Sequence, residues 1–147
     1  MSHECLFCRI ARGEIACHAV YEGDAILAFL DIHPIRPGHT LIIPREHYPW
    51  FEDLSATVAT DITTLAQRLA RNLKAIYRVE RVAMVYAGMH VRHVHAHVVP
   101  IHHAHDITSA SYLKDGLDGF SMPPSPPAQE LEETAKELRE RLAPRAP

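Results

Sequence analysis

The longest amphipathic pattern in the chain follows Ser55. Apolar residues recur at steps of three and four from Val58 to Ile76, which is the spacing that gathers side chains on one face of an α-helix. A serine just before such a pattern accepts a hydrogen bond from the first helical turn. The spacing therefore predicts one long amphipathic helix that begins after Ser55 and ends near Tyr77.

Several shorter apolar segments have the pattern of β-strands. The stretch AVYEGDAILAFLDI predicts a hairpin, with one strand ending near Tyr21, a turn at 22–24 and a second strand over 25–32. The nearly continuous apolar run at 39–44 predicts a buried strand, and VAMVYAG at 82–88 predicts another.

Both ends of the chain add a helical segment. Residues 5–15 mix apolar and basic side chains and predict a short helix or turn, while MPPSPP breaks the chain before a last helix. We expect an α+β fold, with an antiparallel sheet of about five strands, one long central helix and a C-terminal helix. Residues 1–122 form the expected main domain, and 123–147 a proline-rich breaker and helix that pack on it or extend it. The stripe of the last helix is Leu131, Ala135, Leu138 and Leu142.

The segment RHVHAHVVP places His93, His95 and His97 at alternate positions. Alternate residues of a strand share one face, so the pattern predicts a strand with an apolar face in the core and an imidazole row on the other face. Burying imidazole without a partner is unfavourable. The row therefore requires metal, hydrogen-bond partners, a ligand or water, unless it is an exposed strand face that happens to carry histidine.

Composition narrows the class of protein. The 147 residues suit one domain with one core, and the formal charge of −3 without a basic stripe argues against nucleic-acid binding. We find no apolar run long enough to span a bilayer and no secretory signal. Three cysteines without a signal indicate a reducing compartment. We therefore expect a cytoplasmic protein with no membrane or nucleic-acid partner.

Cys5 and Cys8 have the Cys-x-x-Cys spacing that brings two thiolates to one zinc ion. The alternative is that both thiols are small buried apolar groups. A thioredoxin-like dithiol is disfavoured, because no βαβ context surrounds the pair. A zinc site needs two more ligands, and the candidates are His39, His47, His90, His93, His95 and His97.

A histidine held between two others can also act as a nucleophile. Its attacking nitrogen must be unprotonated, so the other nitrogen needs an acceptor that fixes the tautomer. Attack on phosphorus gives a phosphoramidate-type intermediate and splits one displacement into two. His95, with a neighbour on each side, is the best-placed candidate.

Three segments together carry a family resemblance. HVHAHVV resembles the signature of the histidine triad (HIT) superfamily of nucleotide hydrolases and transferases. CLFCRIARGEI is similar to that family's N-terminal motif, and 21–54 resembles its central block, which passes through D-I-x-P and P-G-H-T to I-P-x-x-H. The resemblance covers most of 5–100 and implies a HIT-like catalytic domain over 1–122.

The resemblance also implies residue roles. His95 would take the nucleotidyl group from the α-phosphate, His97 would bind the phosphate or support the site, and His93 would lie at its edge. Asp31 would bond the ribose hydroxyls. The walls of the base site would be Leu6, Phe7, Ile10, Phe29 and Ile32, although plain core packing is an equal alternative for Leu6 and Ile10.

In zinc-bearing relatives the metal is held by the two cysteines, the histidine of I-P-x-x-H and the first triad histidine. The resemblance therefore implies a structural zinc site made by Cys5, Cys8, His47 and His93. All four positions of the metal would be filled by protein.

The chain also departs from the family pattern. Met89 and His90 stand where many members have a polar pair of the phosphate loop, and His33 replaces a usual asparagine. His90 would act at the nucleotide site as a donor or acid, or face solvent. Beyond Pro100, the segment HHAHD at 102–106 reads as a solvated turn, with the substrate end of the site as the alternative.

We therefore expect an enzyme that cleaves at the α-phosphate of a nucleoside monophosphate conjugate through a nucleotidyl-histidine intermediate. The conjugate would be an adenosine phosphoramidate or a dinucleoside polyphosphate, and the resemblance implies a homodimer. One alternative is a nucleotide-binding regulatory or scaffold protein with little turnover. A metal oxidoreductase of the cupin kind is disfavoured by the two helical segments.

Overall fold

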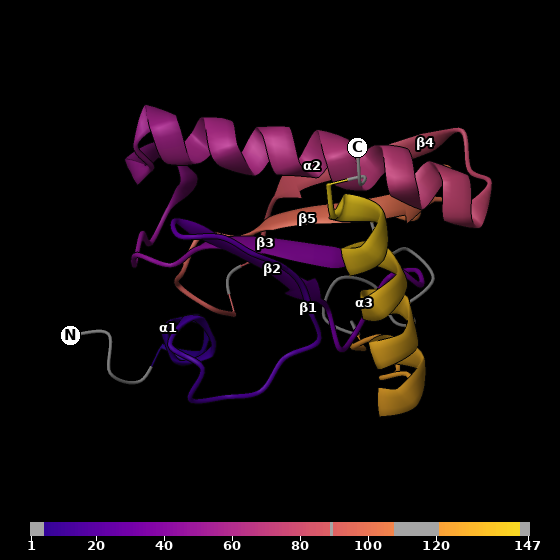
Figure 1. Cartoon of the computed structure of the whole chain (residues 1–147), viewed down its shortest axis with the longest axis horizontal. Helices are drawn as coiled ribbons and strands as arrows, with labels where there is room; N and C mark the ends of the chain where they lie inside the picture. Colours follow the sequence, from indigo (N-terminus) through magenta and orange to yellow (C-terminus); the bar gives the residue numbers. More distant parts are fainter. Residues whose placement is uncertain (1–4, 89, 108–120, 145–147) are drawn as a thin grey trace.

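The computed structural model describes residues 5–88, 90–107 and 121–144. Met89 and residues 108–120, which belong to the expected 1–122 domain, lie outside these residues. Figure 1 shows the elements along the chain. They are α1 (Leu6–Ala11), β1 (Ala19–Glu22), β2 (Ile26–Leu30), β3 (Thr40–Pro44), the 3-10 helix η2 (Phe51–Asp53), α2 (Ala56–Tyr77), β4 (Arg81–Tyr86), β5 (Ala96–Ile101) and α3 (Ala128–Leu142).

The five strands form one sheet in the order β1-β2-β3-β5-β4, and every neighbouring pair is antiparallel. The predicted α+β fold with its five-stranded sheet is confirmed. In the register of the sheet, Phe29 pairs with Leu41, Leu41 with His97, and His97 with Val85. Paired residues point to the same face, so His97 shares its face with Phe29 of the expected base wall.

The sheet buries apolar side chains on both faces. On one face, alternate residues of β2, β3 and β5, such as Ala28, Ile42 and Val98, pack with α2 and α3 in a single core. On the other face, Phe29 and Leu41 belong to a smaller core that includes Phe7 of α1. Figure 1 shows α2 and α1 on opposite sides of the sheet, so the histidine face is the one that α1 approaches.

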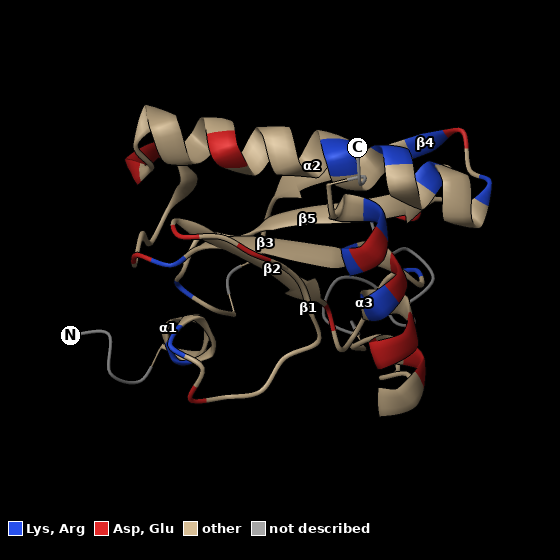
Figure 2. Cartoon of the chain, in the orientation of Figure 1, with Lys and Arg blue, Asp and Glu red and all other residues tan. Residues whose placement is uncertain are grey.

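The two long helices follow their predicted stripes. Ser55 caps α2, since its Oγ accepts a hydrogen bond from the Val58 N–H at 3.2 Å. In α3 the whole predicted stripe is buried. Figure 2 shows acidic and basic residues interleaved along α3, whereas α2 is mostly uncharged. Within the described ranges, no helix has the length and apolar content needed to cross a membrane.

The prediction that one strand holds all three histidines is wrong. β5 begins at Ala96, so His93 and His95 precede it. The backbone N–H of Val94 donates to the Tyr48 carbonyl at 2.7 Å, so the backbone of the segment before β5 is bonded to the loop after β3, outside the ladder between β3 and β5. The predicted alternation survives, because Ala96 lies in the α2 core while His97 faces the other side.

Candidate functional site

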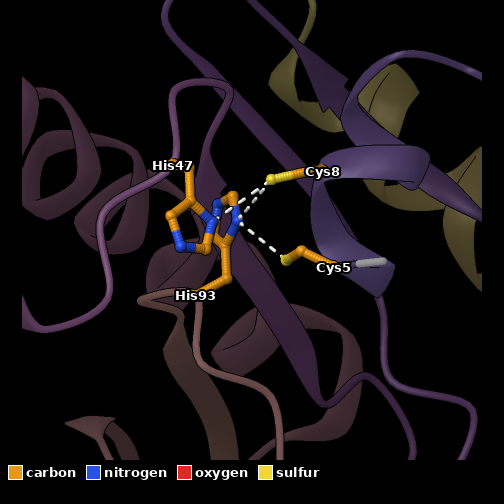
Figure 3. Close-up of side chains that lie close together, drawn as sticks. All are labelled: Cys5, Cys8, His47 and His93. Atoms are coloured by element: carbon orange, nitrogen blue, oxygen red, sulfur yellow. Dashed lines mark hydrogen bonds between the residues drawn. The ribbon is translucent and has the colours of Figure 1, made fainter. Parts of the chain in front are cut away.

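Two cysteines and two histidines from distant parts of the chain meet beside the start of β5. Cys5 precedes α1 and Cys8 lies within it, His47 follows β3, and His93 precedes β5. The Cys8 sulfur is 3.2 Å from His47 Nδ1 and 3.4 Å from His93 Nδ1, and the Cys5 sulfur is 3.5 Å from His93 Nδ1. Figure 3 shows the four side chains converging, and we call them the thiol cluster.

The donor set of the thiol cluster fits a zinc ion. His93 Nε2–H donates to the Pro44 carbonyl at 2.8 Å, and burial lowers the pKa of His93 to about 4. Its Nδ1 lone pair is therefore free for a metal, oriented by the kind of backbone partner that metal-bound histidines use. All four ligand atoms lie within 4.8 Å of one another. Zinc bond lengths imply ligand separations of about 3.3–3.8 Å in a tetrahedral site, so little movement is needed.

His95 lies next to the thiol cluster and has one engaged nitrogen. Its Nδ1–H donates to the His93 carbonyl at 2.7 Å. The tautomer that makes this bond leaves a lone pair on Nε2, and burial lowers the pKa of the ring, which favours the neutral form. Nε2 faces Gly88, whose φ is +116°, and a Cβ added there would lie 2.8 Å from it. Because Gly88 has no Cβ, no side chain at this position blocks the approach to Nε2.

A chain of three hydrogen bonds, which we call the imidazole relay, lies on the other side of His95. The backbone N–H of Ile35 donates to His39 Nδ1 at 3.0 Å, and His39 Nε2–H donates to His97 Nδ1 at 2.9 Å. His97 Nε2–H then donates to the Ala87 carbonyl at 2.8 Å. Both rings are neutral in this arrangement, and burial lowers the pKa of His39 to about 4.

The imidazole relay also excludes His39 as a metal ligand in this arrangement. Asp31, His39 and His97 place ligand atoms close enough for an ion. However, His39 Nδ1 accepts the Ile35 N–H, so its Nε2 must carry the proton and has no lone pair to offer. Of the six histidines considered as zinc ligands from the sequence, only His47 and His93 lie in the thiol cluster.

The carboxylate of Asp31 lies at the edge of the relay. Its Oδ1 accepts the backbone N–H of His33 at 2.8 Å, and its Oδ2 lies 3.6 Å from His39 Nε2. The side chain is half-buried at the end of β2. Both oxygens can accept further hydrogen bonds, which is what a pair of neighbouring hydroxyls requires.

The residues expected to wall a base fall into two groups. Leu6 and Ile32 expose 44% and 52% of their surface, so the alternative that Leu6 is plain core is wrong. Ile10 is half-buried and packs on the smaller core. Phe7 and Phe29 are buried edge to face at 5.7 Å, and Phe7 also meets the His95 ring at 5.1 Å. The residues expected to contact a base thus extend, through Phe7, to the ring of His95.

Four further histidines considered from the sequence lie at the surface. His90 is exposed in the loop before His93. His102, His103 and His105 are exposed in a turn in which the Asp106 carboxylate accepts the backbone N–H groups of His102 and His103. This agrees with the solvated turn preferred from the sequence.

Sequence reasoning missed two contributions to the site. His39 was considered only as a metal ligand, although its place in P-G-H-T directly before a buried strand is a signal for a fixed, internal histidine. The loop at 49–52 was not considered, yet Trp50 and Phe51 line a hollow that reaches His95. Adjacent exposed aromatic residues are the signal that could have drawn attention to it.

Comparisons with known proteins agree with this geometry. A family model described as "HIT domain" matches residues 12–104. The chain is 36% identical over 101 residues to the adenosine 5'-monophosphoramidase hnt1 of Schizosaccharomyces pombe, covering 65% of this chain and 73% of that one. It is 30% identical over 105 residues to the adenylylsulfatase HINT3 of Arabidopsis thaliana, covering 68% and 53%. The crystal structure of a zinc-bound histidine triad family protein from Mycobacterium smegmatis matches with a TM-score of 0.74 at 28% identity, over 97% of this chain and 95% of that one. Because the family model covers well over half of the sequence, the chain belongs to the histidine triad (HIT) family.

Proposed function

We propose that the protein is a hydrolase or transferase that cleaves at the α-phosphate of a nucleoside monophosphate conjugate through a nucleotidyl-His95 intermediate. The observation that carries this proposal is the hydrogen bond from His95 Nδ1–H to the His93 carbonyl. It holds a neutral ring with the Nε2 lone pair directed at the space over Gly88. A neutral imidazole fixed in this way is an activated nucleophile.

The proposed reaction has two steps. The Nε2 lone pair forms a bond to phosphorus, while the bond from phosphorus to the leaving group breaks and its electron pair goes to the departing atom. That atom takes a proton from water, since the proton on His97 Nε2 is held by the Ala87 carbonyl and its loss would leave an imidazolate. Water then attacks phosphorus and loses a proton to solvent, so that no net proton is consumed, and the electron pair of the bond from phosphorus to nitrogen returns to His95 Nε2.

The nucleoside side of the substrate follows from the α1 face of the sheet. Exposed Leu6 and Ile32 supply apolar surface for a flat base, and Asp31 can accept both ribose hydroxyls. His90 would act near the phosphate. An adenine nucleotide is favoured because relatives of this chain are named as an adenosine monophosphoramidase and an adenylylsulfatase. The two names specify different groups joined to the adenylate. A phosphoramidate and another conjugate of the α-phosphate are therefore both candidate substrates.

The thiol cluster would hold a structural zinc ion through Cys5, Cys8, His47 and His93. Bound there, zinc supplies a cross-link and no open coordination position. It would join α1, which carries part of the base wall, to the segment that carries His95. Free thiols are required for loading, which fits the reducing cytoplasm as the location.

A homodimer is the proposed assembly. β4 is an edge strand of the sheet, and Met84 in it exposes 37% of its surface. Edge strands with apolar side chains pair readily with another chain. The mostly uncharged α2 beside β4 would add to this interface.

The test is release of AMP from an adenosine phosphoramidate and from a diadenosine polyphosphate. We expect turnover by the native protein, loss of at least about 1000-fold in His95→Ala, and an acid-labile AMP adduct on His95 by mass spectrometry. The matched control is His103→Ala, an exposed histidine in the turn after β5. Unchanged turnover in His95→Ala would overturn the nucleophile. AMP binding without any turnover would instead favour the nucleotide-binding regulatory protein.

A further inference from the structure

A hollow of about 210 Å³ opens beside His95, on a side that the nucleoside does not use. Its walls include Trp50, Phe51, Glu52, Tyr86 and Gly88, and His95 forms part of its floor. None of the residues expected to bind the base or the ribose lines it. Among the described residues, the hollow meets the nucleoside side at the reacting histidine and at Val91, which packs on the core of Phe7 and Phe29.

The position of the hollow matches that of a leaving group. The His95 ring contacts Phe7 of the base wall and also lines the hollow. Gly88, which faces the attacking Nε2, lines the hollow as well. A group bonded to the phosphorus atom under attack therefore extends into this compartment when the nucleoside occupies the α1 side.

The walls are aromatic and accessible. Trp50 and Phe51 expose 40% and 60% of their surface, and Phe51 stacks on Tyr86 with ring centroids 5.7 Å apart and planes at 25°. Adjacent exposed aromatic residues usually mark a binding surface. An apolar cavity of about 150 Å³ accommodates benzene, so the hollow is large enough for one aromatic ring.

The charge of the walls favours a cation. Among the residues that the structure describes, Glu52 is the only acidic residue that lines the hollow, and no lysine or arginine lines it. Arg92 is not among the lining residues, but its Cζ lies 5.7 Å from the Trp50 ring centroid, so this ring already contacts one cation. The groups left to attract a second cation are Glu52 and the Phe51 and Tyr86 rings. Aromatic faces beside a carboxylate attract cations and repel anions.

We infer that this hollow is the leaving-group subsite, and that it selects an amine leaving group with an aromatic ring and a positive charge over an anionic leaving group such as a nucleoside polyphosphate. This inference rests on the proposed function, since it assigns the second half of the same substrate. Trp50, Phe51 and Tyr86 hold the ring, and Glu52 sets the preference for charge.

A binding experiment measures whether ligands occupy the hollow, independently of any reaction. Trp50 is the only tryptophan in the chain, so intrinsic fluorescence of the native protein with AMP reports on this wall. We expect a saturable change with 1,4-bis(aminomethyl)benzene and a weaker one with 4-(aminomethyl)benzenesulfonate. Phe51→Ala should weaken the first response about tenfold, the value of one good aromatic contact, and Glu52→Gln should reduce the preference between the two amines. Equal responses to both amines, or no saturation, would overturn the inference.

A turnover test then assigns the subsite to the reaction. The substrates are adenosine phosphoramidates of the same two amines and of propylamine, and the readout is the ratio of their kcat/KM values. We expect the cationic aromatic conjugate to be fastest and its advantage over the propylamine conjugate to fall about tenfold in Phe51→Ala. The control is Ile107→Ala, an exposed apolar residue after β5 that does not line the hollow and has no assigned role.

The outcomes separate the inference from the proposed function. AMP release that depends on His95 but has the same kcat/KM for all three conjugates would overturn the inference and keep the function. Binding of the diamine without AMP release from any conjugate would overturn both the function and the leaving-group assignment. If Trp50 fluorescence changed with protein concentration but not with either amine, a second copy of the chain would cover this wall. That result would overturn the inference.

Discussion

The thiol cluster and the imidazole relay lie on either side of His95 and use histidine in opposite ways. In the thiol cluster, the protonated nitrogen of His93 is held by a carbonyl and its lone pair points at two sulfur atoms. In the imidazole relay, every described lone pair of His39 and His97 accepts an N–H, and every N–H has an acceptor. The backbone partners of each ring, and not the spacing of the histidines, decide which group can bind metal.

The largest expected effect is on the thiol cluster. Cys8→Ala should remove one equivalent of zinc and lower the free energy of unfolding by about 3 kcal/mol or more, a fall in Tm of about 10 °C. Metal analysis and thermal unfolding measure both. Cys17→Ala is the control, because Cys17 lies outside the cluster. If Cys8→Ala kept its full zinc content, the thiol cluster would not be the metal site, and the proposed difference between it and the imidazole relay would be wrong.

The second-largest expected effect concerns the space over Gly88, between the thiol cluster and the imidazole relay. Gly88→Ala places a methyl group 2.8 Å from His95 Nε2, which should lower kcat about 100-fold or more while zinc stays bound. Gly13→Ala is the control, since Gly13 has a φ of +75° and nothing within 4 Å of the added Cβ. It tests an alanine at a positive φ without the steric block. Equal kcat in both variants would mean that Nε2 does not attack from this side.

A smaller loss is expected from the imidazole relay. His39→Leu removes the donor to His97 Nδ1 and should lower kcat about tenfold to a hundredfold, because an unsupported ring loses its fixed tautomer. His39→Gln retains an amide donor in a comparable place and should recover part of the rate. Zinc content should be unchanged in both. Loss of zinc in His39→Leu would show that the two groups are one unit.

The smallest effect is a dependence of stability on pH. His39 has a pKa of about 4 in the fold against 6.5 in an unfolded chain, so the unfolded state binds more protons between these values. Stability should therefore fall as pH decreases from 6.5 towards 4, by about 1 kcal/mol at pH 5.5. Denaturant unfolding of native protein and His39→Gln at pH 7.5 and 5.5 measures this term. An identical pH dependence in the two proteins would contradict the low pKa of His39.

Much of the fold could be predicted from local pattern. The stripe of α2, the cap at Ser55 and the all-buried β3 follow from residues near in sequence. The start of β5 could not, because it depends on the bond between Val94 N–H and the Tyr48 carbonyl, two segments far apart in the chain. Local alternation gives the faces of a strand but not the residue at which its pairing begins.

The candidate site divides in the same way. The thiol cluster could be predicted from the motifs through the family resemblance, and its four side chains converge. The role of His39 could not be predicted, because the two ends of the imidazole relay, the Ile35 N–H donor and the Ala87 carbonyl acceptor, are main-chain groups that no side-chain pattern records. The hollow at Trp50 and Phe51 depends on where the loop after β3 turns, which is a tertiary feature.

The acceptors that fix the three triad rings are the carbonyls of Pro44, His93 and Ala87. A carbonyl belongs to the peptide backbone, so no point mutation deletes it while the chain keeps its path. Positions 44 and 87 can therefore drift over evolutionary time without altering the tautomers of the imidazoles. Selection then acts on the course of the backbone more than on the identity of these residues, and a lineage can diverge widely while keeping the same chemistry.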